Sequence, residues 1–544
     1  MKSNRRLVLY FDINKTTIMR DSFDDLPSVH AALCDIVAKF SWGTVSIKEE
    51  GEEQKKVWTL AHEQPATNCP EEGMINYRTF IDDTYPKIEP TEEEEQDEAR
   101  LEEIAAKNRE NLAQRVEKLL NFTRAGGPGL KMKSHLDKLS KALSLPKNVK
   151  DELGITDEVI LSQMQTISAG VREEGKGPGS EEGTVGVKDQ PSTLEEGEEK
   201  KAEGTLEGAT VQEETAEQRF FSLFREGKFF LIPSFFKTLV FLKKSKREFA
   251  VVFRSMGNDV GSVDFEFTKF AEGEHPCYNG KNGNPIVRLD GSKGNKDFRI
   301  REPNKGLWYR YGAGPRNTRL VLGTLRRVKS AAPEDLEEAY SGEIEEGSVQ
   351  LISDPVEMYV QIMECLKRSC SMIIQDDFKL WDETDWNPDY GKVLLVDQAD
   401  YNTQHIFFDD HADTNMDVRD LISGDKIPPR KYLNKYVVHV EPHRAVLESD
   451  YFVKMIEMCE ARRDEEIERI EQGNESEEEG AVEEPNEWEK LQGAPKEEYL
   501  MKTVMPVLYQ GMKMVAIERP KAPLEYLALF MLKNQDKVKM PVPP

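Results

Sequence analysis

The sequence predicts an α/β fold built around a parallel sheet, and two observations indicate it. Short apolar runs of strand length end abruptly in polar residues at 7–11, 249–253 and 405–408. Segments with helical periodicity, such as the one from Ser28 to Phe40, separate these runs along the chain. Strands that alternate with helices form parallel sheets. Ligands of such sheets bind beyond the carboxyl ends of the strands, so the residues just past each run are the candidates for a functional site.

The composition describes an acidic chain. It has 544 residues, with 101 Asp and Glu against 74 Lys and Arg, and a net charge of −27. Because nucleic acids and anionic membranes attract clustered Lys and Arg, we expect neither as a partner. The six cysteines are scattered without metal-binding spacing, which favours reduced thiols in a cytosolic protein.

Changes in composition predict the order of the domains. The strand-like runs place the α/β core in three pieces, at 1–60, 218–257 and 351–446. The remaining segments are a helical insertion at 61–170, a disordered acidic linker at 171–217, a β-rich insert or cap at 258–350, a charged helix with an acidic linker at 447–496, and a pair of helices at 497–535. The linkers are rich in Glu and nearly lack large apolar side chains. The β-rich insert is expected from short strand-like pieces between glycine turns.

The polar residues that follow the three apolar runs form the candidate site. They are Asp12, Asn14 and Thr16 after the first run, Ser255 after the second, and Asp409 and Asp410 after the third. If the three strands are neighbours, these side chains meet in one crevice. Converging carboxylates need a hard cation, and Mg²⁺ prefers oxygen ligands. A carboxylate beside Mg²⁺ can attack a phosphoryl group, although each residue alone is also explained as a turn or cap residue.

These motifs resemble those of the haloacid dehalogenase-like (HAD) superfamily. "FDINKT" resembles its first motif, "VVFRS" its second and "HIFFDD" its fourth, while Lys392 in "YGKVLLVD" matches the lone lysine of its third better than Lys379 does. The resemblance implies a Rossmann-like parallel sheet that binds Mg²⁺. It assigns catalysis to Asp12 and Asn14, phosphate binding to Thr16, Ser255 and Lys392, and metal binding to Asp12, to the Asn14 carbonyl, and to Asp409 and Asp410.

One position departs from the family pattern. Family phosphatases carry a second Asp two residues after the nucleophile as general acid and base, and this chain has Asn14 there. An amide cannot transfer the proton, and general acid–base catalysis is typically worth about 10²–10⁴-fold. We therefore expect a domain of weak or lost activity, with an active Mg²⁺-dependent phosphatase or phosphotransferase as the alternative.

The C-terminal segment predicts two short amphipathic helices joined by a turn. Pro520 breaks the first helix and Pro523 is placed to begin the second. The apolar positions with helical spacing are Leu500, Val504, Val507, Leu508, Met512, Leu524, Leu527, Ala528 and Met531. Two such helices cannot bury their apolar faces alone. We expect them to pair with a second copy and to accept an amphipathic helix of a partner protein in the groove that remains.

This segment resembles the dumpy-thirty (Dpy) motif, which is related to the dimerisation and docking domain of protein kinase A regulatory subunits. The resemblance implies a homodimer or heterodimer that docks on a larger assembly. Proteins with this motif include chromatin methyltransferase subunits and axonemal proteins of cilia and flagella. The expected function is a scaffold protein of the ciliary or flagellar axoneme, such as the radial spoke, in the cytoplasm; the nucleus is the alternative location.

Overall fold

The computed structural model describes residues 5–20, 26, 28–50, 53–91, 97–162, 215–281, 286–328, 332, 335–384, 386–412, 414–472 and 504–534. Most of the predicted linker at 171–217, the acidic tract after 472 and Leu500 lie outside these residues. The chain divides into two compact units, Met1–Arg463 and Asp464–Pro544.

The first unit is built on an eight-stranded, mostly parallel sheet, which confirms the predicted α/β class. The strand order is β13-β11-β1-β5-β9-β6-β7-β8. In that order the strands are Val437–His439, Thr403–Asp409, Arg6–Asp12, Phe249–Ser255, Ser371–Asp376, Lys305–Arg310, Thr318–Leu322 and Gln350–Ile352. Strand β1 lies between β11 and β5 and is parallel to both. The three apolar runs predicted as strands are therefore direct neighbours.

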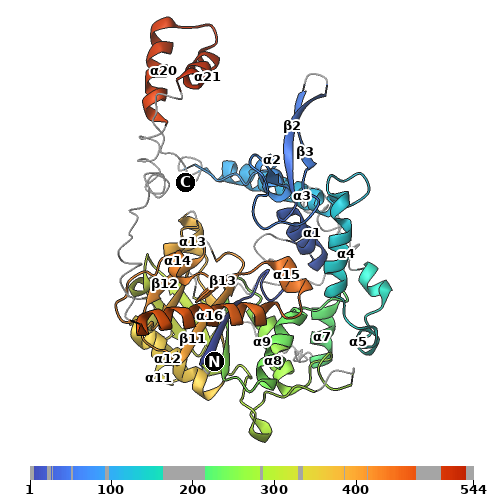
Figure 1. The fold of residues 1–544 in the computed structure, drawn as a ribbon, viewed down its shortest axis with the longest axis vertical. Coiled ribbons are helices and arrows are strands. Elements are labelled where there is room, and N and C mark those ends of the chain that lie inside the picture. Colours follow the sequence, from blue (N-terminus) through green and yellow to red (C-terminus); the bar gives the residue numbers. More distant parts are fainter. Residues whose placement is uncertain are drawn as a thin grey trace, which may run out of the picture. The chain divides into compact units, whose positions relative to one another are not determined.

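Helices cover both faces of this sheet. Alternate residues of β1 face opposite layers: Leu7, Leu9 and Phe11 belong to one hydrophobic core, and Val8 and Tyr10 to another. The helices of the first layer include α1 (Val29–Lys39), α8 (Pro233–Lys244), α9 (Val260–Glu272), α15 (Pro442–Leu447) and α16 (Tyr451–Glu471). Helix α16 crosses the sheet at β11 (Figure 1). The second layer contains α12 (Pro355–Arg368) and a two-stranded parallel sheet of β10 (Lys392–Val396) and β12 (Met416–Asp420). Burial on both faces explains why the strands are continuous apolar runs.

Helix α1 begins after Ser28, whose hydroxyl accepts a hydrogen bond from the Ala31 N–H at 3.0 Å, as predicted for an N-cap. The helix is not amphipathic, because it is buried on nearly all sides. Three helices of the 61–170 region pack against it, namely α2 (Tyr77–Thr84), α3 (Glu98–Asn121) and α4 (Lys133–Ala142). An antiparallel sheet of β2 (Trp42–Glu50), β3 (Glu53–Leu60) and β4 (Ile75–Asn76) precedes them. Residues 61–162 therefore complete the core around α1.

Two predicted features differ from the structure. Residues 258–350 do not form a separate β-rich insert: α9 opens this segment, and β6, β7 and β8 extend the main sheet. Periodicity marks strands but does not say which sheet they join. The apolar run at 393–396, which the same strand pattern predicts, forms β10, but this strand pairs with β12 outside the main sheet. Its place in the main sheet is taken by β9, which follows α12 after a short link.

The other helices of the first unit are short. They are α5 (Lys147–Glu152), α7 (Ala216–Phe224), α10 (Asp335–Ala339), α11 (Ser341–Glu345), α13 (Lys379–Glu383) and α14 (Pro429–Tyr432). Among the described residues, no helix has the length and apolar character needed to cross a membrane.

The second unit contains two helices, α20 (Met505–Glu518) and α21 (Pro523–Lys533). Arg519 ends α20 in the left-handed conformation, with φ of 45°, and Pro523 occupies the first turn of α21. The helices approach closely at Gly511, where an added Cβ would lie 2.5 Å from Leu527 Cδ1. A side chain at this position would push the two helices apart.

Candidate functional site

The carboxyl ends of the three neighbouring strands bring the predicted site residues to one edge of the sheet. Asp12 ends β1, Ser255 ends β5 and Asp409 ends β11. Parallel pairing places all three ends on the same edge, because β1 is hydrogen-bonded to both of the other strands. The three strand ends therefore meet in one crevice, as expected if their side chains form a common site.

Lys392 joins two of the predicted carboxylates. Its ammonium contacts Asp12 Oδ1 and lies 2.8 Å from Asp409 Oδ2, and all three side chains are buried. Lys392 reaches this position from β10, the strand outside the main sheet. The weaker candidate, Lys379, instead has an exposed side chain 3.7 Å from Glu383.

The charges in this cluster do not balance. Burial and the charges of Asp409 and Asp410 raise the pKa of Asp12, although the Lys392 ammonium opposes them. For Lys392, burial lowers the pKa but the carboxylates of Asp12 and Asp409 outweigh it and raise the value. One ammonium therefore faces the two buried carboxylates of Asp12 and Asp409, while the third, Asp410, faces the His411 imidazole. A second cation or a proton can neutralise this excess of negative charge.

Asp410 and Asn415 each supply an oxygen atom that has no hydrogen-bond partner among the described residues. Asp410 Oδ1 lies 3.1 Å from His411 Nδ1. Although burial raises it, the charge and hydrogen bond of His411 lower the pKa of Asp410 below its ordinary range. Asp410 Oδ2 and Asn415 Oδ1 are buried and accept no hydrogen bond from the part of the chain that the structure describes. Ligand atoms of Asp409, Asp410 and His411 lie within 4.8 Å of one another. Buried oxygen atoms with unused lone pairs fit a hard cation such as Mg²⁺.

Asn14, Ser255 and Thr16 lie beside this cluster with their side chains held in other ways. Asn14 Nδ2 donates to Asp259 Oδ2 at 3.0 Å, and Ser255 Oγ donates to Asn14 Oδ1 at 3.3 Å. The Ser255 hydroxyl is fully buried and also accepts from the Gly257 N–H. Thr16 is fully buried, and its hydroxyl has no partner among the described residues. Of the predicted phosphate-binding residues, Lys392 lines the cavity described next, and Thr16 and Ser255 do not.

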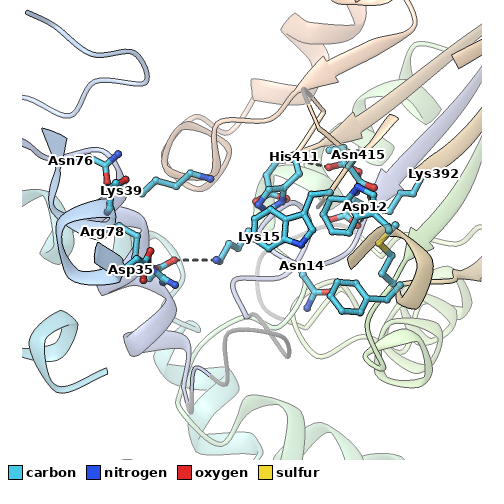
Figure 2. Close-up of a pocket in the computed structure, with 18 residues that line it drawn as sticks. Asp12, Asn14, Lys15, Asp35, Lys39, Asn76, Arg78, Lys392, His411 and Asn415 are labelled. Carbon is cyan, nitrogen blue, oxygen red and sulfur yellow. Dashed lines mark hydrogen bonds and ion pairs between the residues drawn. The ribbon is translucent and has the colours of Figure 1, made fainter. Parts of the chain in front are cut away.

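A cavity of about 340 Å³ opens over the cluster. Asp12, Asn14, Lys392, Asp409 and Asp410 line one side of it, and residues of α1 and α2 line the other. Figure 2 shows Lys15 pointing away from Asp12 to meet Asp35, at 3.1 Å. Figure 2 also shows Lys39 pointing toward His411.

Sequence reasoning missed the residues on the far side of this cavity. Asp35 and Lys39 belong to α1, and Arg78 to α2. Asp35 binds both Lys15 and Arg78 and is almost fully buried. A carboxylate within an otherwise apolar helix was the available signal, since such a group is rarely buried unless it is paired.

The C-terminal helices leave much of their apolar surface uncovered. Val507 is buried, and Val504, Leu508, Leu527 and Met531 are partly buried. The exposed fractions are 45% for Met512 and 82% for Leu524, and Ala528 is also exposed. Leu524 and Ala528 therefore remain uncovered within one copy, and their predicted burial against a second copy stays a prediction.

Comparison with known proteins identifies the C-terminal segment as a dimerisation and docking module. Residues 495–536 match the family described as the Dpy-30 motif, which confirms that resemblance. A curated relative, the Set1 complex component sdc1 of Schizosaccharomyces pombe, is 47% identical over 49 residues. This match covers 8% of the chain and 45% of the relative, so the chain spans less than half of the relative's length. No solved structure matches the chain significantly.

This comparison corrects the predicted function. The expected axonemal scaffold, with its ciliary, flagellar and radial-spoke location, is wrong, because the matched relative is a component of a Set1 complex. The alternative, a phosphatase localised by the docking tail, has no support from the comparison either. The motif itself does not distinguish these assemblies, since the sequence analysis associated it with chromatin methyltransferase subunits as well as with axonemal proteins.

Proposed function

We propose that this chain is a nuclear docking subunit of a Set1-type complex and that it binds the complex through its Dpy-30 motif. The observation that carries the proposal is the match of residues 495–536 to the motif, together with the 47% identity to a Set1 complex component. The alternative location of the sequence analysis, the nucleus, fits this assignment.

The uncovered apolar surface of the two helices supports docking. Helices α20 and α21 pack against each other at Gly511, and this contact leaves Met512, Leu524 and Leu529 exposed at 45%, 82% and 53%. Three large apolar side chains exposed within so short a segment are typical of a protein interface. We propose that a second copy covers part of this surface and that an amphipathic helix of a partner protein covers the rest.

The test is the recovery of Set1-complex subunits with the tagged, full-length chain from nuclear extract. Wild type should recover them. Leu508→Glu should not, because a charge replaces a partly buried leucine at the proposed interface. Ile422→Glu is the matched control, since Ile422 is exposed in the first unit and lies outside the motif. Recovery of the same subunits with Leu508→Glu, or of none with wild type, would contradict the proposal.

We further propose that the first unit is a HAD-like domain that binds Mg²⁺ at the strand-end cluster. The neighbouring positions of Asp12, Ser255 and Asp409 on one edge of a parallel sheet support the family assignment. The buried oxygens of Asp410 and Asn415, which accept no hydrogen bond from the described part of the chain, support the metal. Asp12, Asp409, Asp410 and the Asn14 carbonyl are the proposed ligands. When bound, Mg²⁺ would supply positive charge for the oxygens of a phosphate group, beside Lys392.

Thermal unfolding with and without Mg²⁺ tests this second proposal. A ligand present at 100 times its dissociation constant stabilises the folded state by about 2.7 kcal/mol, which raises the unfolding temperature measurably. Asp410→Asn should abolish the Mg²⁺-dependent rise. Asp389→Asn should preserve it, because Asp389 forms an exposed ion pair with Lys426 away from the cluster. An equal rise in wild type and Asp410→Asn would show that Mg²⁺ binds elsewhere.

A further inference from the structure

An aromatic wall forms one side of the cavity over the strand-end cluster. Phe378, Trp381 and Trp386 all line the cavity, and they follow β9 in and around α13. The rings of Trp381 and Trp386 are stacked, with centroids 5.6 Å apart and an interplanar angle of 16°. Phe378 meets Trp381 edge to face at 5.9 Å. None of the predicted metal or phosphate roles accounts for these three rings.

Hydrogen bonds within the chain fix the two indole rings. Trp381 Nε1 donates to the Thr414 carbonyl at 3.0 Å, and Trp386 Nε1 donates to Asp382 Oδ1 at 3.1 Å. Because both indole N–H groups already donate hydrogen bonds within the chain, the rings present their flat faces to a ligand.

Trp386 is placed at the cavity at some conformational cost. Its backbone φ is 59°, in the left-handed region that large residues rarely occupy. Its side chain is nevertheless 53% exposed, although Trp381 covers one face. The exposed half of this large side chain contributes nothing to the hydrophobic stabilisation of the fold. Its exposure beside a cavity is explained if a ligand covers the remaining face.

The opposite side of the cavity is polar. Lys15, Lys39 and Arg78 line it together with Asp35, which pairs with Lys15 and Arg78. Lys392 lies at the floor, between Asp12 and Asp409. A volume of about 340 Å³ is in the range of small-molecule sites, which combine apolar walls with a few placed polar groups. The cavity therefore combines a stacking surface, cationic groups and the cluster proposed to bind Mg²⁺.

From this combination we infer that the cavity binds a nucleoside monophosphate, with its base stacked on Trp386 and its phosphate directed to Lys392. The inference rests on the proposed Mg²⁺ and phosphate site and adds the class of ligand. A planar ring matches the indole faces, and a phosphate matches Lys392 together with the proposed Mg²⁺, which would offset the carboxylates of the floor. The cavity volume suits a mononucleotide better than a polymer.

Calorimetric titration of the full-length protein with adenosine monophosphate, ribose 5-phosphate, phenyl phosphate and inorganic phosphate tests the inference. Each titration is made with and without Mg²⁺. Wild type should bind adenosine monophosphate about 10-fold more tightly than ribose 5-phosphate, which lacks the ring. Phenyl phosphate should bind less tightly than the nucleotide. Tighter binding of phenyl phosphate would overturn the nucleotide assignment and identify the ligand as a simple aryl phosphate.

Variants separate stacking from folding effects. Trp386→Leu should remove the preference for the nucleotide and leave ribose 5-phosphate binding unchanged, while Trp386→Phe should retain most of the preference. Phe241→Leu is the control, because Phe241 is an exposed aromatic residue on α8 that does not line the cavity. Equal affinity for nucleotide and sugar phosphate, or a preference that survives Trp386→Leu, would overturn the inference. Phosphate binding without dependence on Mg²⁺ would instead contradict the proposed metal site while the nucleotide preference stood.

Discussion

Lys392 is the residue on which the strand-end cluster depends, because its ammonium contacts Asp12 and Asp409 in a buried position. We predict that Lys392→Met destabilises the first unit by about 3–5 kcal/mol, the usual result of leaving buried charges without a partner. Denaturant unfolding followed by tryptophan fluorescence measures the loss.

Lys426→Met is the matched control for this substitution. Lys426 pairs with Asp389 at the surface, and exposed ion pairs contribute at most about 1 kcal/mol. Added Mg²⁺ should restore part of the stability lost in Lys392→Met, since it neutralises the same carboxylates. Equal effects of the two substitutions would show that the cluster does not need the ammonium.

His405 makes the stability of the first unit depend on pH. It is buried, with Nδ1 3.2 Å from the Tyr10 hydroxyl and Nε2 3.1 Å from the Tyr359 hydroxyl. Burial lowers the pKa of His405 from 6.5 to about 4. The unfolded chain therefore takes up a proton at a higher pH than the folded chain does. Stability is full above the unfolded pKa and falls as the pH decreases toward the folded pKa.

The expected loss from His405 is about 2 kcal/mol between roughly pH 7.5 and pH 5. His405→Gln should flatten this part of the unfolding free energy against pH. His62→Gln is the control for the change of residue type, because the His62 ring Nδ1 lies 2.7 Å from the carbonyl of Gln64, two residues along the chain, and not beside buried hydroxyls. A profile of His405→Gln as steep as that of wild type would assign the pH dependence to other groups.

At the scale of elements, Gly511 sets the contact between α20 and α21. A Cβ there would lie 2.5 Å from Leu527 Cδ1 and 3.0 Å from Phe530 Cδ1. Gly511→Ala should weaken the dimer and the helix pair, by about 1–3 kcal/mol for an overpacked contact. Sedimentation equilibrium of the full-length chain measures the change in the dimer.

Gly261 provides the comparison for this prediction. It lies in α9, and an added Cβ would have open space around it, so alanine there should be neutral or stabilising by up to about 1 kcal/mol. Each of the two substitutions adds one methyl group to a helix. A difference between their effects therefore reflects the neighbouring atoms at the two positions. A neutral or stabilising Gly511→Ala would mean that the helices adjust without cost.

The elements that sequence reasoning predicted correctly are those with a strong local signal. Strands β1, β5 and β11 are apolar runs with clear ends, and Ser28 is a recognisable cap. Strand β9 was missed because its residues continue the apolar pattern of α12 with only a short break. The pairing of β10 outside the main sheet depends on long-range contacts that no local pattern encodes.

The site was predictable in part for the same reason. Residues that end strands can be read from the sequence, and Asp12, Asp409 and Lys392 do meet. The far side of the cavity comes from α1, α2 and the segment after β9. The positions of its residues in the sequence, such as Asp35 and Trp386, do not predict that they lie near Asp12. Folding alone brings them to one cavity.

At the scale of the whole molecule, net charge opposes self-association. Each chain carries −27, so a homodimer brings two strongly acidic chains together. Salt screens this repulsion, with a Debye length of about 10 Å at 0.1 M. The dissociation constant of the proposed homodimer should therefore decrease as NaCl rises from about 50 to about 300 mM. Sedimentation of Leu508→Glu under the same conditions gives the monomer baseline, and a dimer that weakens with salt would indicate an interface held by opposite charges.

The most direct test of the central proposal is the affinity of the purified full-length chain for a purified Set1 complex, with and without residues 495–536. We predict saturable binding by the intact chain and its complete loss on deletion of the motif, with the unfolding of the first unit unchanged. Equal binding by the intact and deleted chains, or no binding by either, would contradict the proposal that the Dpy-30 motif docks this protein on such a complex.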